Sequence, residues 1–183
     1  MSHPRNGDED PRLSLLRARV RDIPDFPKPG ILFRDLTPLM GDGLAFGQTV
    51  ELLAERLAHH RPDLVIAVES RGFIFGAPVA AALDIGFVPV RKPGKLPHRT
   101  ARRTYALEYG TDTLEIHADA VVAGARVAIV DDLLATGGTA QATIELVREL
   151  GGQVSVAAFV IELGLLRGRE RLVGCAVESL IRY

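Results

Sequence analysis

Short, unbroken runs of β-branched and small apolar residues recur along the chain. The clearest is Val127 to Val130, and Leu64 to Val68 and Ile85 to Val90 have the same character. Such runs are typical of strands buried on both faces of a parallel sheet. Two more strands are expected at Gln153 to Ile161 and, as an edge strand, at Cys175 to Leu180.

Helical spacing of apolar residues lies between these runs. Val50, Leu53 and Leu57 share one face of a helix expected from Ala45 to His59. The same spacing predicts helices over Leu13 to Asp22, Phe73 to Leu83 and Ala140 to Leu150, and a mixed, mostly helical stretch over Glu162 to Arg171. Strands that alternate with helices predict an α/β fold with a mostly parallel central sheet flanked by helices.

Three segments depart from this alternation. Met1 to Pro11 is polar, with proline, glycine and acids, and is predicted to be a disordered tail before one domain over residues 12–183. Three prolines within six residues predict no regular structure between Ile23 and Pro38. Thr104 to Glu108 and Thr113 to His117 alternate in polarity and predict a hairpin whose turn starts at Tyr109-Gly110.

Composition places this domain in a broad class without naming an activity. The chain has 183 residues, 47% of them hydrophobic, and a net charge of −1. No apolar run approaches the roughly 20 residues that span a bilayer. Cys175 is the single cysteine, so an internal disulfide is excluded. We therefore expect a soluble, cytoplasmic protein that is no general polyanion binder.

The strongest candidate for chemistry follows the strand Val127 to Val130. Asp131 and Asp132 come where that strand should end, and Ala135 to Thr139 form a small-residue loop before a helix. Free N–H groups at a helix N-terminus attract phosphate, and glycines allow close backbone approach. The two carboxylates suit sugar hydroxyls or a metal ion. The pattern predicts a site for a phosphorylated sugar, against the simpler alternative of a strand, a loop and two incidental acids.

Two further stretches carry polar side chains near predicted strand ends. Glu69-Ser70-Arg71-Gly72-Phe73 follows the strand Leu64 to Val68, and could equally be a helix cap with a solvated arginine. Arg91 to Arg103 contains six Arg or Lys residues and no acid. Such a loop could bind phosphates through charge-assisted hydrogen bonds. A solvated basic loop is the alternative, and a nucleic-acid surface is weaker, because only Tyr105 and Tyr109 could stack on bases.

These motifs together resemble those of the type I phosphoribosyltransferases. The central motif has their pattern of four apolar residues, two acids, two apolar residues and Ala-Thr-Gly-Gly-Thr. The resemblance runs from about Leu13 to Tyr183 and includes three other segments: Pro24-Asp-Phe-Pro27 with Gly30-Ile-Leu-Phe-Arg-Asp35, Ser70-Arg-Gly-Phe73, and Gly94-Lys-Leu-Pro97 with Leu107-Glu-Tyr-Gly110. His98 to Arg103 is more basic than this family leads us to expect.

The resemblance implies a fold and a reaction. The expected fold is that of the type I phosphoribosyltransferases, Rossmann-like, with a hood over about residues 23–40 and a flexible β-hairpin loop over about 91–112. The expected reaction transfers 5-phosphoribosyl from phosphoribosyl diphosphate to adenine, giving AMP and pyrophosphate, with Mg²⁺ as cofactor and a homodimer as the assembly. A cis peptide at Glu69–Ser70 and glycine-only dihedrals at Gly137 or Gly138 are also implied.

The resemblance also implies roles for individual residues. Asp131 and Asp132 would orient the ribose and could assist Mg²⁺ through water, while Glu108 would handle a proton on the purine. The remaining expected contacts are with the 5′-phosphate (Ala135, Thr136, Gly137, Gly138, Thr139), the pyrophosphate (Ser70, Arg71, Arg91, Lys95) and the adenine (Leu32, Phe33, Arg34).

Two other functions remain open at this stage. One is a phosphoribosyltransferase for 6-oxopurines, because hypoxanthine reverses the donor and acceptor pattern that adenine presents. The other is a regulator that senses phosphoribosyl diphosphate, although that reading expects an added helix-turn-helix or a basic face, which the short acidic N-terminal segment does not supply.

Overall fold

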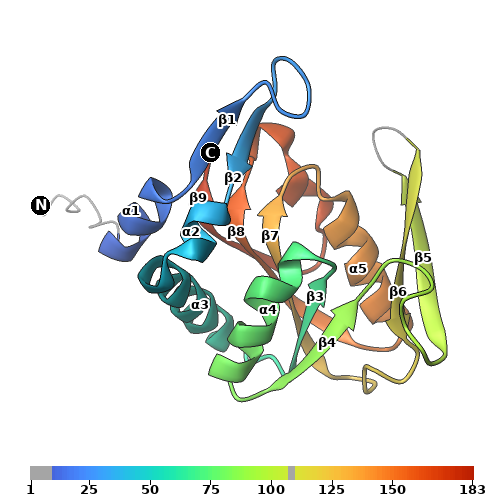
Figure 1. Cartoon of the computed structure of the whole chain (residues 1–183). Coiled ribbons are helices and arrows are strands. Elements are labelled where there is room, and N and C mark those ends of the chain that lie inside the picture. The colour runs from blue at the N-terminus through green and yellow to red at the C-terminus, as the bar shows by residue number, and fades with distance from the viewer. Residues whose placement is uncertain (1–9, 107–109) are drawn as a thin grey trace, which may run out of the picture. The chain divides into compact units, whose positions relative to one another are not determined.

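The computed structural model describes residues 10–106 and 110–183, which divide after Thr49 into two compact units (Figure 1). Most of the predicted tail lies outside the described residues, and so do residues 107–109, which include Tyr109 at the predicted start of the hairpin turn. A single domain from residue 12 onward stays a prediction.

The first unit contains a short helix and a hairpin. Helix α1 (Pro11–Ala18) begins after Asp10, whose carboxylate accepts a hydrogen bond from Arg12 N at 2.9 Å. Strands β1 (Arg21–Pro24) and β2 (Leu32–Asp35) pair antiparallel. The predicted helix to Asp22 is therefore wrong at its C-terminal end, because residues 21–24 enter this ladder.

The expectation that residues 23–38 lack regular structure is also wrong. Pro24 ends β1, and Pro27 and Pro29 lie in the loop of the hairpin, where no ladder N–H is needed. Asp25 in this loop accepts a hydrogen bond from Gly30 N at 2.7 Å. Two helices follow the hairpin: α2 (Thr37–Gly41) and α3 (Gly43–Ala58).

The second unit is built on a five-stranded sheet in which every pairing is parallel. Its strand order is β4-β3-β7-β8-β9. The predicted α/β fold with a parallel central sheet is confirmed, including the edge position of the last strand. The strands are β3 (Leu64–Val68), β4 (Gly86–Val90), β7 (Arg126–Leu134), β8 (Gln153–Glu162) and β9 (Ala176–Arg182).

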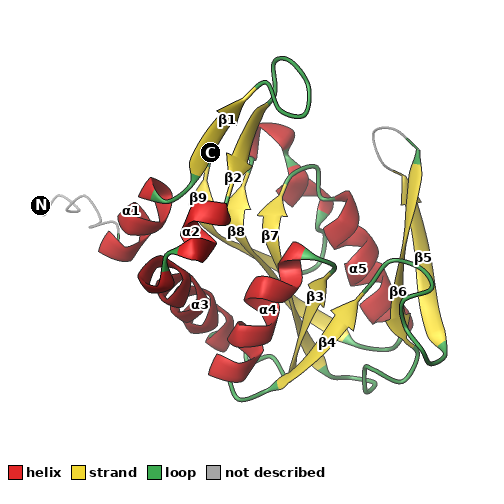
Figure 2. Cartoon of the chain, viewed as in Figure 1, coloured by secondary structure: helices red, strands yellow, loops and turns green. Residues whose placement is uncertain are grey.

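Helices α4 (Arg71–Ala82) and α5 (Gly138–Glu149) cover opposite faces of this sheet (Figure 2). A Cβ added at Gly76 of α4 would lie 2.5 Å from the Cβ of Ala67 in β3. The neighbouring strand residue Ile66 instead belongs to the buried cluster that includes Ile144 of α5. Successive strand residues point to opposite faces, so the two helices lie on different sides. The absence of a side chain at Gly76 lets α4 approach the sheet closely.

A hairpin of β5 (Thr100–Ala106) and β6 (Thr111–His117) packs beside α5. Strand β5 begins inside the segment 91–103, which was predicted to be entirely loop. Its inward-facing Arg103 explains the difference, because its guanidinium pairs with Glu145 at 2.6 Å and Glu149 at 2.5 Å on α5. Arg102 and Arg103 therefore lie in a paired strand and Arg99 lies directly before it, although all three belong to the loop predicted to be flexible.

The stretch predicted to be mostly helical after β8 forms two short 3₁₀ helices, η1 (Gly164–Leu166) and η2 (Gly168–Arg171). A glycine begins each turn, and Arg167 between them has a left-handed φ of 53°. No helix in the described part of the chain is long and apolar enough to cross a bilayer.

Candidate active site

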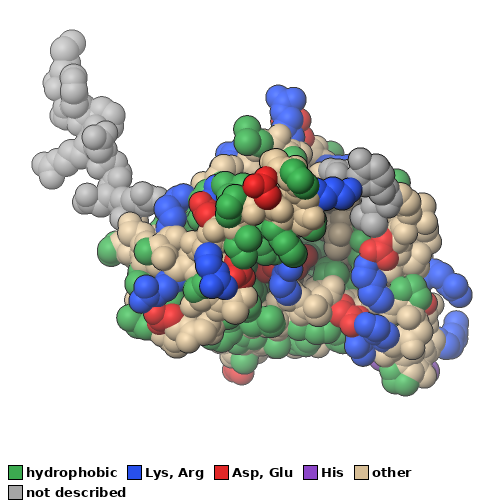
Figure 3. All heavy atoms as spheres, turned by 45° about the horizontal axis from the view of Figure 1, so that its top comes forward, with side chains coloured by type: hydrophobic (Ala, Val, Ile, Leu, Met, Phe, Trp, Pro, Cys, Tyr) green, Lys and Arg blue, Asp and Glu red, His purple; other side chains and the backbone are tan. Residues whose placement is uncertain are grey.

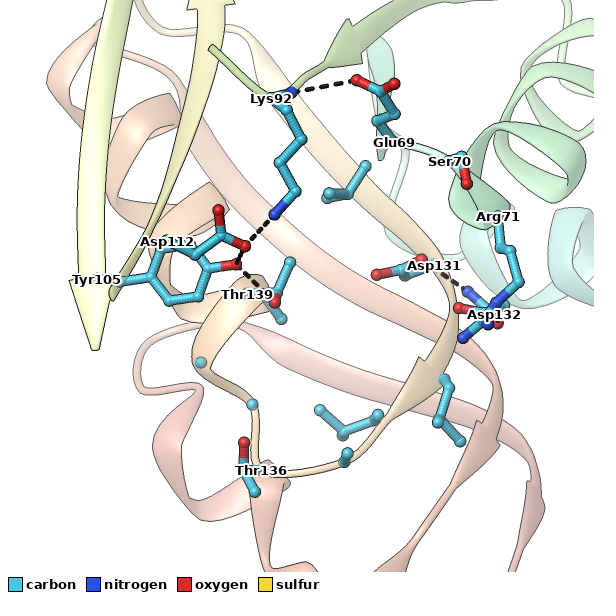
Figure 4. A pocket seen from close by; sticks show the side chains of 17 residues that line it. Glu69, Ser70, Arg71, Lys92, Tyr105, Asp112, Asp131, Asp132, Thr136 and Thr139 are labelled. Atoms are coloured by element: carbon cyan, nitrogen blue, oxygen red, sulfur yellow. Dashed lines mark hydrogen bonds and ion pairs between the residues drawn. The ribbon is translucent and has the colours of Figure 1, made fainter. Parts of the chain in front are cut away.

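The polar residues that follow β3 meet those at the C-terminal end of β7. Strand β7 continues beyond the predicted end at Val130 and contains Asp131 and Asp132, because its ladder with β8 extends to Leu134. Strands β3 and β7 are neighbours, with Ala67 opposite Val130, so Glu69 to Arg71 come close to Asp131 and Asp132. They border a pocket of about 400 Å³ (Figure 4). The pocket is lined by Val68, Glu69, Ser70, Arg71, Lys92, Tyr105, Asp112 and residues 131–140.

The segment Ala135 to Thr139, here called the glycine loop, leads directly into α5. Gly137 has a φ of +80°, as predicted for one of the two glycines. A Cβ at Gly137 would in addition lie 2.6 Å from the carbonyl oxygen of Gly168. Both observations require glycine at this position. The N-terminal N–H groups of α5 thus border the pocket and suit an anion there.

Asp131 and Asp132 have different surroundings. The carboxylate of Asp132 is almost buried and accepts a hydrogen bond from the guanidinium of Arg71. Asp131 accepts a hydrogen bond from Asp132 N at 2.9 Å. Burial, followed by the charge of Asp132, raises the pKa of Asp131 well above its usual value. A carboxylate that water stabilises poorly is suited to hydroxyl donors of a bound ligand.

Close packing fixes the approach of α4 to this acid pair. A Cβ at Gly72 would lie 2.8 Å from the Asp131 carboxylate oxygen Oδ1. The expected cis peptide at Glu69–Ser70 is present, one residue before α4 begins. The sequence Ser70-Arg71-Gly72 therefore brings a hydroxyl and a guanidinium to the pocket while leaving room for Asp131.

Glu69 forms hydrogen bonds with several basic residues of the segment that follows β4. Its carboxylate accepts hydrogen bonds from Lys95 Nζ, from Arg91 Nε at 3.2 Å and from Lys92 N at 3.1 Å. The bond from Lys95, with those from Arg91 and Lys92, lowers the pKa of Glu69 to about 2. Arg91 and Lys95, predicted to contact pyrophosphate, bind this carboxylate and do not themselves line the pocket.

Sequence reasoning missed three pocket residues, Lys92, Tyr105 and Asp112. Figure 4 shows them on one side of the pocket, where Lys92 Nζ pairs with the Asp112 carboxylate. The Tyr105 hydroxyl lies 3.0 Å from Thr139 Oγ1 and 3.3 Å from Asp112 Oδ2. Burial raises the pKa of Asp112, but hydrogen bonds from Lys92 and Thr113 outweigh it and leave the pKa lowered. Alternation along the hairpin was the available signal, since it puts Tyr105 on the same face as Arg103.

The remaining predicted site residues are not among the residues that line this pocket as described, which all belong to the second unit. Leu32, Phe33 and Arg34 belong to β2 of the first unit. There the Phe33 ring contacts that of Phe26 edge to face, with centroids 5.2 Å apart. Glu108 lies outside the described residues.

Basic and acidic side chains are mixed on the face that Figure 3 draws. Arg103, Lys92 and Lys95 each pair with a carboxylate. This distribution does not favour nucleic-acid binding, for which a basic face is expected.

The fold and pocket define the class of this protein. A parallel sheet, an acid pair near the C-terminal end of a central strand and a glycine loop at a helix N-terminus form a site of the type that binds phosphorylated sugars. A sequence profile described as "Phosphoribosyl transferase domain" matches residues 41–172. The chain belongs to the phosphoribosyltransferase family.

Within this family, the similar proteins are adenine phosphoribosyltransferases. That of Desulfitobacterium hafniense (strain Y51) is 59% identical over 164 residues, which cover 90% of this chain and 95% of that protein. The crystal structure of the Thermoanaerobacter pseudethanolicus protein has a TM-score of 0.90 and 54% identity, and covers 93% of this chain and 99% of that one. The Saccharomyces cerevisiae protein, solved with an imino-altritol bisphosphate and adenine, has a TM-score of 0.87 and 40% identity over 93% of this chain and 98% of that one.

Proposed function

We propose that this chain transfers the 5-phosphoribosyl group of phosphoribosyl diphosphate to adenine, forming AMP and pyrophosphate in purine salvage. The observation that carries the proposal is the pocket between the ends of β3 and β7, where an acid pair, an arginine and a glycine loop converge. The acid pair, the arginine and the glycine loop offer separate partners to the ribose hydroxyls, the pyrophosphate and the 5′-phosphate of the substrate. The similar proteins named above support adenine as the acceptor.

The reaction is a substitution at the anomeric carbon of the ribose, with positive charge growing on the ring as pyrophosphate departs. The glycine loop and the start of α5 hold the 5′-phosphate, so binding energy away from the reacting carbon positions it. Asp131 accepts hydrogen bonds from the ribose hydroxyls and opposes the growing positive charge. Ser70 and Arg71 hold the departing pyrophosphate.

We propose that Lys92 also contacts the pyrophosphate, in addition to the cations predicted from the sequence. Its ammonium lines the pocket, whereas Arg91 and Lys95 are held by Glu69 beside it. To contact pyrophosphate, Arg91 and Lys95 must break their ion pairs with Glu69 and pair with the substrate instead. We propose that this exchange accompanies substrate binding.

The residues present fit a magnesium ion carried mainly by the substrate. No group of three or more potential metal-ligating His, Cys, Asp or Glu side chains is found in the part of the chain described. Mg²⁺ is commonly bound through one or two carboxylates together with phosphate oxygens, and Asp131 and Asp132 could supply that share. Bound there, the ion would offset the negative charge of the leaving group.

The acceptor side of the site is proposed from the family resemblance. Glu108 handles a proton of the purine, and Leu32, Phe33 and Arg34 contact the adenine. A homodimer and a cytoplasmic location are proposed on the same basis, and analytical ultracentrifugation tests the dimer.

A direct comparison of bases tests the proposed function. The purified chain, with Mg²⁺ and phosphoribosyl diphosphate, is given adenine, hypoxanthine or guanine in parallel, and nucleotide and pyrophosphate are both quantified. We expect AMP and pyrophosphate in equal amounts with adenine, and little product with the other bases. Efficient formation of IMP or GMP would instead identify a 6-oxopurine enzyme, and binding of phosphoribosyl diphosphate without transfer would favour the sensor.

A further inference from the structure

The 3₁₀ helix η2 makes a backbone contact with the glycine loop that the reaction itself does not explain. A Cβ added at Gly168 would overlap the carbonyl oxygen of Ala135 and lie 3.0 Å from Gly137 N. In the reverse direction, a Cβ at Gly137 would lie 2.6 Å from Gly168 O. The two backbones therefore approach so closely that neither position accepts a side chain.

An ion pair between the buried Glu162 and the partly exposed Arg169 holds η2 in this place. The carboxylate of Glu162 is 2% exposed and accepts hydrogen bonds from Arg169 Nε at 3.0 Å and Arg169 Nη2 at 2.6 Å. Ser179 Oγ donates a third at 2.7 Å. Arg169 also donates to Val177 O at 2.6 Å, so that one guanidinium joins η2 to the end of β8 and to the first residues of β9. Such a two-pronged pair fixes direction as well as distance.

The position of Glu162 relates the pair to the glycine loop. Glu162 is the last residue of β8 and lies opposite Leu134, the residue directly before that loop. The loop is thus held at its start by the β7–β8 ladder, and over Ala135 and Gly137 by Gly168. The hydrogen bond from Arg169 lowers the pKa of Glu162, so the carboxylate is charged at neutral pH.

We propose that Glu162, Arg169 and Gly168 are positioning residues for the glycine loop, and that they determine how tightly this chain binds the 5′-phosphate of its substrate. The proposal rests on the proposed function. None of the three lines the pocket bordered by Asp131 and Asp132. They act through the loop, whose N–H groups can match a phosphate only while the backbone holds its left-handed turn at Gly137.

Two variants separate positioning from a general structural role. Gly168→Ala adds one methyl group against the loop. Glu162→Gln with Arg169→Met removes both charges of the pair, so that neither is left without the other. Arg182, whose Nε lies 3.5 Å from Glu162 Oε1, has an exposed side chain and stays solvated. Asp63→Asn is the control, because the Asp63–Arg126 pair, at 3.0 Å, lies at the start of β7, the other end of the strand from the glycine loop.

Isothermal titration calorimetry then measures ribose 5-phosphate and pyrophosphate separately on each protein. Pyrophosphate serves as an internal reference, since its proposed partners belong to the segments after β3 (Ser70, Arg71) and after β4 (Arg91, Lys92, Lys95) and not to η2. We expect both variants to bind ribose 5-phosphate about 10-fold more weakly or worse, the scale of a small misplacement, with pyrophosphate affinity within about 2-fold of wild type. The control should match wild type for both ligands.

Unchanged affinity for ribose 5-phosphate in both variants would overturn the proposal, and so would an equal loss for both ligands. Thermal unfolding of the ligand-free proteins shows that the folded state is being compared. Formation of AMP by wild type is measured on the same preparation. If wild type formed no AMP, the result would count against the proposed function. The ratio of the ribose 5-phosphate affinity to the pyrophosphate affinity in the variants tests only the positioning of the glycine loop.

Discussion

The carboxylate of Asp131 lies among groups that oppose its ionisation. Burial and the neighbouring Asp132 raise its pKa, while Arg71 compensates only in part. Active sites commonly retain such unfavourable charges because a ligand uses them. The predicted consequence is that Asp131 lowers the stability of the ligand-free protein.

Asp131→Asn should therefore raise the melting temperature of the ligand-free protein at neutral pH. The pKa of Asp131 is raised above its usual 3.8, so the folded state binds the proton more tightly than the unfolded state. Stability is then lost as pH rises from 3.8 through the folded pKa, and the loss is complete above it. The gain in Asp131→Asn should shrink as pH falls toward 3.8. Thermal melts from pH 3 to 8 measure it. Asp132→Asn, which removes the partner of Arg71, should show no gain, and a lower melting temperature for Asp131→Asn at neutral pH would contradict this account.

Glu108→Gln should lower the single-turnover rate of AMP formation by about 10²-fold, the usual scale for general acid–base catalysis. The amide keeps the size of the side chain but lacks a basic carboxylate. Affinity for phosphoribosyl diphosphate should change little. A single-turnover measurement is needed because chemistry need not limit the steady-state rate. An unchanged rate would leave Glu108 without a role in proton transfer.

At the residue scale, the sequence predicts what a local motif defines. The turn at Gly137 and the acids after Val130 could be expected from the order of residues alone. Lys92 and Asp112 could not, because their pairing depends on how residues far apart in the chain are brought together by β5, β6 and the segment after β4. The cis peptide at Glu69–Ser70 came from the family resemblance and not from physical reasoning about the residues.

At the scale of elements, the hairpin of β5 and β6 is joined to the glycine loop. The Tyr105 hydroxyl contacts Thr139 Oγ1 at the start of α5, and Arg103 pairs with two acids further along that helix. The hairpin and α5 thus contribute one wall of the pocket together.

A double-mutant cycle of Tyr105→Phe and Thr139→Val tests this connection. Each single variant should lower the free energy of unfolding by about 1 kcal/mol, the usual net worth of a hydrogen bond. The double variant should lose less than the sum, because both changes remove the same 3.0 Å contact. Urea denaturation measures all four corners. Thr104→Val is the matched control, since Thr104 contacts Thr113 on the exposed side of the hairpin. Strict additivity would mean that the contact does not join the two elements.

The inner strands of the central sheet, β3, β7 and β8, were predicted well because their burial is extreme. Runs such as Val127 to Val130 are fully buried, and their composition reports that directly. The start of β5 and the two 3₁₀ helices of the same unit were not predicted. The first unit was predicted poorly, because β1 is largely exposed, β2 is only partly buried, and neither contains a clear alternation of apolar residues. Their ladder depends on a turn after Pro24 that no short pattern in the sequence specifies.

At the scale of the molecule, strand order creates the site. The chain passes from β3 outward to β4, then returns to β7 on the other side of β3 and continues outward through β8 to β9. Ligands of open α/β sheets bind where the order reverses in this way. Motifs separated in the sequence by α4, β4 and the β5–β6 hairpin therefore meet. The sequence predicted each motif at a strand end, but only the order β4-β3-β7-β8-β9 makes them neighbours.

The central claim is that the crevice after β3 and β7 binds the phosphorylated sugar. The most direct test is the double variant Asp131→Asn with Asp132→Asn, compared with wild type for phosphoribosyl diphosphate affinity and for AMP formation from adenine. Both side chains line the pocket, so we expect a folded protein whose AMP formation falls by about 10²-fold or more, as expected when a reacting group loses its positioning. Circular dichroism and thermal melting check that the fold is intact. Wild-type turnover and affinity in a folded double variant would contradict the assignment of this crevice as the active site.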